Sequence, residues 1–170
     1  MRCRLKDVCL ITMGVSPKSD TYNKAGIGVP LLNGPTEFGK TFPECSLFTT
    51  ASKRECEEND LLFCVRGSTT GKMNWADRSY SLGRGVCAIR GRTVSITKYI
   101  RFVIEDKLKE LLNFATGGTF PNLSKEVIEN FEIDLKPNTD KIASILSTYD
   151  DLIENNLRRI KLLRSGTNDL

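Results

Sequence analysis

The hydrophobic positions of residues 138–164 follow a seven-residue repeat that predicts one long helix. Apolar side chains recur at alternating intervals of four and three residues, and the one polar member of the series is Asn156. We expect this series to contact another helix; its members are Ile142, Leu146, Tyr149, Ile153, Asn156, Ile160 and Leu163. At ~1.5 Å per residue, such a helix is on the order of 40 Å long.

The apolar stripe of this predicted helix is wider than a two-stranded coiled coil requires. Ile145, Leu152, Ala143 and Leu157 flank the series, and a stripe of that breadth usually packs against more than one neighbour. Acidic residues gather in the first half and basic residues in the second, so an antiparallel partner helix places acid opposite base. Two interpretations stay open, a core helix of a monomer and a helix that pairs with another helix, and the pattern favours the second.

Before this helix, the pattern predicts an α+β domain with a small twisted, mostly antiparallel sheet and short helices. Short apolar runs alternate with glycine-containing turns between residues 60 and 92, which is typical of consecutive strands. The expected strands are 61–65, 72–75 and 86–90, with earlier ones at 29–32 and 47–49. The periodicity of residues 5–14 does not separate helix from strand.

Helical periodicity returns after residue 94, with a break expected near Glu105. Ser124 is the predicted N-cap of a short helix over 125–130, and residues 131–135 alternate like a strand. The predicted division of the chain is 1–137 for a globular domain, 138–165 for a helical spacer or dimerisation helix, and 166–170 for a tail.

The 170-residue chain has six cysteines and no histidine. The cysteines are scattered without a CxxC pair, so neither a zinc site nor a disulfide framework is indicated, and a reducing compartment fits. The absence of histidine removes the commonest general base, and no metal or cofactor motif is present. No apolar run approaches the ~20 residues that cross a bilayer, and the amino terminus lacks a signal-peptide pattern. These features favour a cytoplasmic protein without catalysis of its own.

Positive charge is concentrated between Arg66 and Arg101, where eight basic residues stand against Asp77 alone and the net charge is +7. The rest of the chain, with 17 basic and 20 acidic residues, has a net charge of −3. One explanation is a solvated sheet edge guarded by cations. The functional explanation is a binding surface for a polyanion.

The segment GSTTGK over residues 67–72 invites comparison with a nucleotide-binding P-loop, but its spacing fails. Arg66 stands where that motif requires its first glycine, and Met73 follows the lysine in place of serine or threonine. The chain also lacks the NPPY or DPPY tetrad of a DNA-base methyltransferase and a convincing cluster of nuclease carboxylates. A plain hairpin turn is one interpretation of the loop. The other is that its small hydroxyl residues donate hydrogen bonds to phosphates and base edges.

Four segments, taken in order, resemble one half of the specificity subunit of type I restriction-modification systems. They are LKDVCLITMG with VPLLN, NDLLFCVRGSTTGK, ATGGTFPNLSKEVIENFEIDLKP, and KIASILSTYDDLIENNLRRIKLLR, and together they cover nearly the whole chain. In that family, each target-recognition domain recognises one part of a split DNA sequence, while helices space two such domains and bind the modification subunits. The resemblance implies double-stranded DNA, methyltransferase subunits and, through them, restriction subunits as partners. It implies no enzymatic activity for the chain itself.

A complete specificity subunit of that family holds two recognition domains and two helical regions, whereas this chain has one of each. We therefore expect either a natural half-subunit that dimerises through antiparallel helices or a fragment of a longer subunit. The chain departs from the family pattern at Phe120, where a polar residue is usual. The alternative functions are a protein-interaction adaptor and the recognition domain of a methyltransferase-nuclease outside the type I systems.

The side chains expected to contact DNA lie in the basic stretch and its hydroxyl loop, with a weaker set in earlier loops. The first set is Arg66, Ser68, Thr69, Thr70, Lys72, Arg78 and Arg84, and the weaker set is Lys18, Lys24, Asn33 and Lys40. Thr119 and Asn122 are expected to fix the fold near the junction with the long helix. Trp75 and Tyr80 are expected in the core or the sheet rather than against bases.

Overall fold

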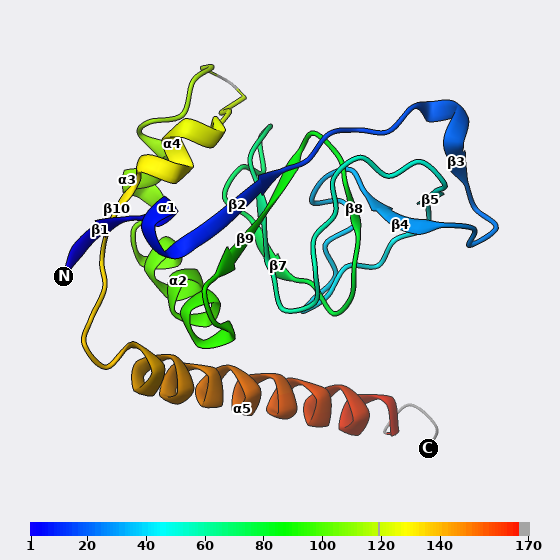
Figure 1. Ribbon diagram of the computed structural model, residues 1–170. Helices are drawn as coiled ribbons and strands as arrows, with labels where there is room; N and C mark the ends of the chain where they lie inside the picture. Colours follow the sequence, from blue (N-terminus) through cyan, green and yellow to red (C-terminus); the bar gives the residue numbers. More distant parts are fainter. Residues whose placement is uncertain (119, 167–170) are drawn as a thin grey trace.

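The computed structural model describes residues 1–118 and 120–166 and has the predicted α+β organisation (Figure 1). The strands are β1 (Arg2–Arg4), β2 (Cys9–Met13), β3 (Tyr22–Asn23), β4 (Val29–Leu32), β5 (Phe48–Thr49), β6 (Leu61–Cys64), β7 (Met73–Trp75), β8 (Ser81–Leu82), β9 (Val86–Gly91) and β10 (Glu132–Asp134). The helices are α1 (Leu5–Val8), α2 (Val94–Asp106), α3 (Leu108–Leu112), α4 (Lys125–Asn130) and α5 (Thr139–Gly166), with a 3₁₀ turn η1 at Ser19–Thr21.

An antiparallel sheet in the order β2-β9-β6-β7, the central sheet, forms the middle of the domain. Strand β6 lies in its interior, and all four of its residues are buried. A short continuous apolar run is the pattern expected for a strand covered on both faces. The strand predicted over 61–65 is therefore confirmed, with the ladder ending at Cys64.

A second sheet in the order β3-β5-β4-β8, the small sheet, lies beside the central one (Figure 1). Its β3–β5 and β4–β5 pairs are antiparallel. Its β4–β8 pair is parallel, with Leu31 opposite Ser81 and Leu32 opposite Leu82. The predicted mostly antiparallel arrangement is correct, and the parallel pair arises because β8 is reached by a long connection rather than a hairpin.

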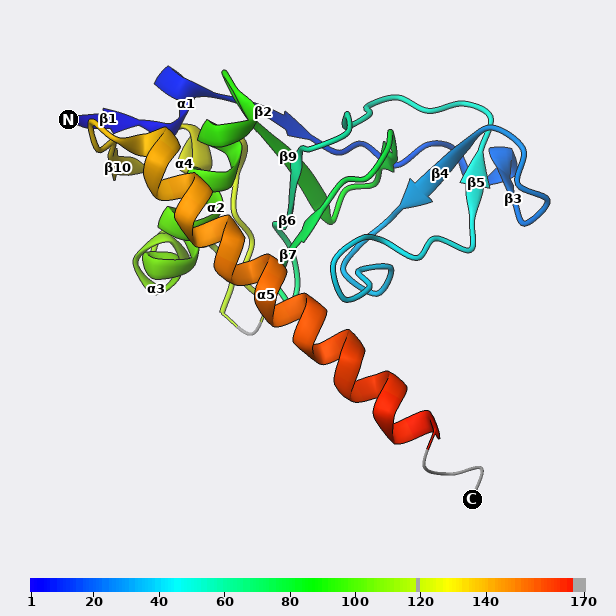
Figure 2. The ribbon, with the colours of Figure 1, turned by 90° about the horizontal axis from the view of Figure 1, so that it is seen from below.

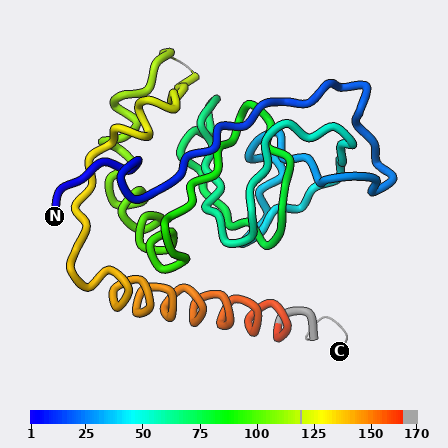
Figure 3. The backbone as a smooth tube through the Cα atoms, viewed as in Figure 1, coloured from blue at the N-terminus to red at the C-terminus, as the bar shows by residue number. Residues whose placement is uncertain are grey.

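The first strand, β1, pairs with β10, so the amino terminus lies beside the segment that leads into the last helix (Figure 3). The terminal ammonium of Met1 donates to Asp134 Oδ1 at 3.0 Å and to the Leu135 carbonyl at 2.7 Å. Hydrogen bonds from Lys136 and from this ammonium lower the pKa of the Asp134 carboxyl to about 2. The two ends of the globular domain are thus joined just before α5.

Local sequence signals account for most helix boundaries. Thr93 caps α2 by accepting a hydrogen bond from the Ile96 amide, and Ser124 caps α4, as predicted, by accepting from the Val127 amide. The expected break near Glu105 falls at Lys107, between α2 and α3. The ambiguous segment 5–14 contains both structures, since α1 passes directly into β2.

The two faces of β6 contribute to two hydrophobic clusters. Leu61 and Phe63 face the larger cluster, which includes residues of α2 and α4, whereas Leu62 faces a smaller one with Tyr80. Alternate side chains of a strand point to opposite faces, which explains this division. Tyr80 is fully buried and Trp75 packs against the larger cluster, as the sequence predicted.

The last helix, α5, lies along α2, and its second half extends beyond the globular domain (Figure 2). Ala143 is 1% exposed and belongs to the larger hydrophobic cluster, with Ile142 packed beside it. Farther along, Arg101 of α2 donates from Nη1 to Asp150 Oδ2 at 2.6 Å. One face of the helix is therefore fixed to the domain by an apolar contact and an ion pair.

The other face of α5 remains exposed in this single chain. Of the predicted pairing series, Ile142 and Leu146 are partly buried, while Tyr149 is 62% and Ile153 58% exposed. Asn156, Ile160 and Leu163 are exposed as well. The stripe thus has two sides, as its breadth suggested, and pairing through the exposed side stays a prediction.

We predict that Asp60→Ala lowers the free energy of unfolding by about 3 kcal/mol, because it leaves the partly buried guanidinium of Arg90 without the carboxylate that it pairs with. Asp60 is 1% exposed and accepts from Arg90 Nε at 2.7 Å and Nη2 at 2.9 Å. Glu57 contacts the same arginine from an exposed position, so Glu57→Gln should cost less than about 1 kcal/mol. Urea denaturation measures both, and equal effects would contradict the prediction.

We also predict that Ala143→Glu destabilises the chain by more than about 2 kcal/mol, because it forces a charge and extra volume into a filled contact. Ser144, its exposed neighbour, provides the matched control, and Ser144→Glu should change stability by less than about 0.5 kcal/mol. Thermal unfolding with hydrogen exchange along α5 measures the effect. Unchanged protection of α5 in Ala143→Glu would show that this contact does not hold the helix.

Candidate nucleic-acid interface

Several turns meet at one end of the central sheet because its strands are antiparallel. The register places Met13 opposite Cys87, Cys64 opposite Val86 and Phe63 opposite Met73. The end of β2, the end of β6 and the beginnings of β7 and β9 therefore share one edge. The connecting segments 14–16, 65–72 and 83–85 emerge together there.

Backbone hydrogen bonds join these segments into one surface, here called the loop edge, which also includes residues 32–34, 116–118 and 120–123. The Val65 amide donates to Gly85 O at 2.9 Å, and the Gly14 amide donates to Val86 O at 3.0 Å. The Gly83 amide donates to Leu32 O at 2.8 Å, and a Cβ at Gly83 would lie 2.7 Å from the Cα of Asn33. Most of the loop edge lies on the side of the central sheet opposite α5 (Figure 1), while Gly71 also lines the cleft beside that helix.

The 66–71 loop has a fixed backbone. Gly67 and Gly71 have φ values of 94° and 98°, a region that favours glycine. The Gly71 amide donates to Cys64 O at 2.9 Å, which closes the turn between β6 and β7. The Thr70 hydroxyl lies 2.7 Å from Gly67 O and 2.9 Å from Pro121 O, so its proton is used inside the protein.

The structure brings most of the stronger candidates together at the loop edge. Arg66, Ser68, Lys72 and Arg84 are exposed there, while Thr69 and Thr70 are partly buried. Asn33, from the weaker set, joins them through its contacts with the segment around Gly83. No local pattern in the sequence indicates that Asn33 lies at the same surface as residues 66–72, because residues far apart in the chain make the contacts that place it there.

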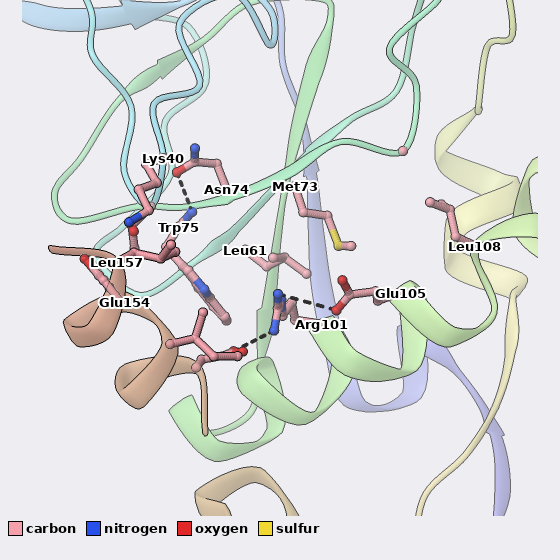
Figure 4. A pocket seen from close by; sticks show the side chains of 14 residues that line it. Lys40, Leu61, Met73, Asn74, Trp75, Arg101, Glu105, Leu108, Glu154 and Leu157 are labelled. Atoms are coloured by element: carbon pink, nitrogen blue, oxygen red, sulfur yellow. Dashed lines mark hydrogen bonds and ion pairs between the residues drawn. The ribbon is translucent and has the colours of Figure 1, made fainter. Parts of the chain in front are cut away.

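The other candidates lie elsewhere. Arg78 is placed over the ring of Tyr80, 5.6 Å from its centroid. Lys18 and Lys24 flank η1 and β3 at the far end of the small sheet (Figure 1). Lys40 lines a cleft of about 420 Å³ between the domain and α5, near Trp75 and Glu154 (Figure 4).

The positive charge of the basic stretch is less available than the sequence count implied. Arg90 pairs with Asp60 and Glu57, and Arg101 pairs with Glu105 and Asp150, so these two arginines of the stretch already have acidic partners within the protein. By contrast, no described carboxylate lies within salt-bridge distance of Arg66, Lys72 or Arg84. Arg92 and Lys98 also lack a described acidic partner, but Arg66, Lys72 and Arg84 lie together at the loop edge.

Sequence reasoning did not identify the role of Arg101 in holding α5, and it expected Asn122 at a different place in the fold. Arg101 holds α5 through Asp150 at one corner of the cleft, with its guanidinium 4.7 Å from the Phe102 ring centroid (Figure 4). Asn122 was expected near the junction with the long helix, but it pairs with Thr116 and Arg66 at the loop edge. Thr119 lies outside the described residues.

Residues 1–118 and 120–166 contain neither a membrane-spanning helix nor a metal-binding cluster. No described helix combines the length and apolar character needed to span a bilayer. No group of three or more His, Cys, Asp or Glu side chains in this part of the chain is placed to hold a metal ion. Burial raises the pKa of the Cys9, Cys45 and Cys56 thiols to about 12.

Solved structures share this fold. The HsdS subunit from Thermoanaerobacter tengcongensis matches with a TM-score of 0.77 and 28% identity, over 94% of this chain and 39% of that one. A chain from a study of complex assembly and conformational transition of the type I R-M system matches with a TM-score of 0.79 and 28% identity, over 98% and 41%. The S subunit from M. genitalium has the same fold, with a TM-score of 0.71 at 19% identity, over 97% and 42%.

The sequence comparisons agree with the fold. The putative type I restriction enzyme MjaX specificity subunit of Methanocaldococcus jannaschii is 34% identical over 147 residues, which are 85% of this chain and 34% of the relative. The chain thus spans about a third of that curated relative. The family model described as type I restriction modification DNA specificity domain matches residues 1–164. This chain therefore belongs to the family of type I restriction-modification DNA specificity domains.

Proposed function

We propose that this chain is a sequence-recognition module that binds one half of a split duplex DNA target and docks modification subunits. Residues 1–137 form the recognition domain, 138–165 the spacer and pairing helix, and 166–170 a tail, of which 167–170 lie outside the described residues. The observation that carries the proposal is the loop edge, where no described carboxylate lies within salt-bridge distance of Arg66, Lys72 or Arg84. The chain's membership of a family of DNA specificity domains supports DNA as the ligand.

The loop edge combines the two kinds of group that DNA recognition uses. The cations neutralise phosphates, which provides affinity and makes binding depend on salt. Exposed Ser68, partly buried Thr69 and Asn33, which contacts the segment around Gly83, supply short polar groups for base edges in the major groove. Arg78, Lys18, Lys24 and Lys40 lie away from this surface, so we assign them to flanking phosphates at most.

The chain carries out no chemistry in this proposal. Methylation belongs to partner methyltransferase subunits, and cleavage to restriction subunits that join through them. The exposed side of α5 is the surface for a second helix, either of another copy or of the rest of a longer subunit. Its acidic first half and basic second half favour an antiparallel partner, and Asn156 in the series favours one register.

This geometry separates the two activities in space. Apart from Gly71, which lines the cleft beside α5, the loop edge and α5 lie on different sides of the domain, so DNA and a helical partner bind without competing (Figure 1). The ion pair between Arg101 and Asp150 and the buried Ala143 fix the direction of α5 relative to the loop edge. Two chains paired antiparallel would present two identical half-sites in inverted orientation, separated by the helix length.

We predict that the double variant Lys72→Glu/Arg84→Glu binds duplex DNA at least about tenfold more weakly and with a salt slope reduced by about two, because each phosphate contact contributes about 0.9. Lys141→Glu, an exposed change at the start of α5, is the matched control and should leave binding unchanged. Fluorescence anisotropy against a duplex pool at two salt concentrations measures both. Wild-type protein that binds no duplex, or binds without salt dependence, would favour a protein-interaction adaptor.

We predict that the chain self-associates and that Tyr149→Glu/Ile153→Glu abolishes this, because two charges enter the exposed apolar stripe. Sedimentation velocity compares the variant with the wild type across concentrations. Ser144→Glu is the control, since residue 144 lies outside the series. A wild type that stays monomeric throughout would leave the missing half of a longer subunit as the partner.

A further inference from the structure

The 66–71 loop is tied to a distant segment of the chain. The Leu123 amide donates to Val65 O at 2.9 Å, and the Gly67 amide donates to Pro121 O at 3.1 Å. These bonds place Arg66 opposite Asn122 in an antiparallel bridge. The loop and the segment around residue 122 therefore act as one structural unit.

The distant segment is itself closed by hydrogen bonds. The Thr116 amide donates to Asn122 O at 3.0 Å, and the Asn122 amide donates to Thr116 O at 2.8 Å. Thr70 adds a side-chain contact from the loop, with its hydroxyl 2.9 Å from Pro121 O. The backbone of Asn122 is therefore bonded to Thr116 on one side and bridged to Arg66 on the other, which fixes the position of its Cα and limits where its side chain can reach.

That neighbour is the guanidinium of Arg66, whose Nε donates to Asn122 Oδ1 at 3.3 Å. An arginine has five N–H donors, and this bond uses the one at Nε. No described residue accepts a hydrogen bond from the two Nη groups, which lie side by side in the guanidinium plane. Arg66 is exposed at the loop edge, and no described carboxylate lies within salt-bridge distance of it.

Two parallel N–H donors at the end of an arginine match one feature of the major groove. Guanine presents O6 and N7 as adjacent acceptors, and a bidentate arginine is the commonest specific contact to that base. A free arginine side chain loses rotamer entropy when it binds, so a hydrogen bond that orients it beforehand lowers this loss. Asn122 is placed to do so.

We infer that Arg66 recognises a guanine in the target and that Asn122 is the positioning residue that orients its guanidinium. The inference rests on the proposed DNA-binding function and specifies one base contact within it. Thr70 then holds the loop against residue 121 rather than contacting DNA, because its hydroxyl is already used.

The test is selection from a randomised duplex DNA pool with the full chain, followed by affinity measurements on the selected sequence. Arg66→Ala should remove a guanine preference at one position and weaken specific binding roughly 5- to 150-fold, the range for one bidentate contact. Asn122→Ala should relax the same position and weaken specific binding by a smaller factor. Replacing that guanine with 7-deazaguanine should weaken the wild type and leave Arg66→Ala unaffected.

A double-mutant cycle separates positioning from a general structural role. If Asn122 acts through Arg66, Asn122→Ala should cause no further loss in the Arg66→Ala background. Arg66→Lys keeps the charge, so it should lose the guanine preference while keeping the salt slope. Asn113→Ala is the matched control, an exposed asparagine at the end of α3, and thermal unfolding verifies that each variant is folded.

Three outcomes have distinct meanings. A wild type that enriches no sequence and binds no duplex defeats the proposed function itself. A wild type with a clear motif that Arg66→Ala leaves unchanged, or weakens uniformly with a smaller salt slope, overturns the guanine contact and makes Arg66 a phosphate contact at most. Equal losses from Asn122→Ala in both backgrounds overturn its positioning role.

Discussion

The antiparallel register of β6 against β9 is the constraint on which the rest of this structure depends. It places Cys64 opposite Val86, so the turns that follow β6 and precede β9 emerge at the same edge. The Val65 amide then reaches Gly85 O, and the Leu123 amide reaches Val65 O. Because side chains alternate along a strand, a shift by one residue would exchange the two hydrophobic clusters of β6 and separate these turns.

The same sheet also determines where the long helix lies. Strand β9 leads into α2, with no room for a side chain at Gly91, where a Cβ would lie 2.7 Å from the Thr97 nitrogen. The position of α2 in turn sets that of α5, through Ala143 and the ion pair of Arg101 with Asp150. These contacts connect the proposed DNA surface to the proposed spacer, which suits the proposed role of holding two half-sites at a fixed separation.

The positive charge available for binding depends on which cations lack acidic partners in the fold, not on the number of basic residues in the sequence. The stretch from Arg66 to Arg101 carries a net charge of +7 in the sequence, but Arg90 and Arg101 are neutralised by acids from other segments. Of the cations that remain without a described acidic partner, Arg66, Lys72 and Arg84 lie together at the loop edge. The difference arises because ion pairs form between residues far apart in the chain, which a sequence window does not include.

The sequence by itself determined the elements with local causes: the heptad stripe of α5, the Ser124 cap, the buried strand β6 and the family. It also named Arg66, Lys72 and Arg84 as candidates, since exposed cations around glycine turns are a local pattern. Only the tertiary structure decided that Asn33 lies near them, that Arg78 and Lys40 do not, and that Asn122 accepts a hydrogen bond from Arg66. Those contacts depend on strand register and on loops closed over many residues, and no local periodicity records either.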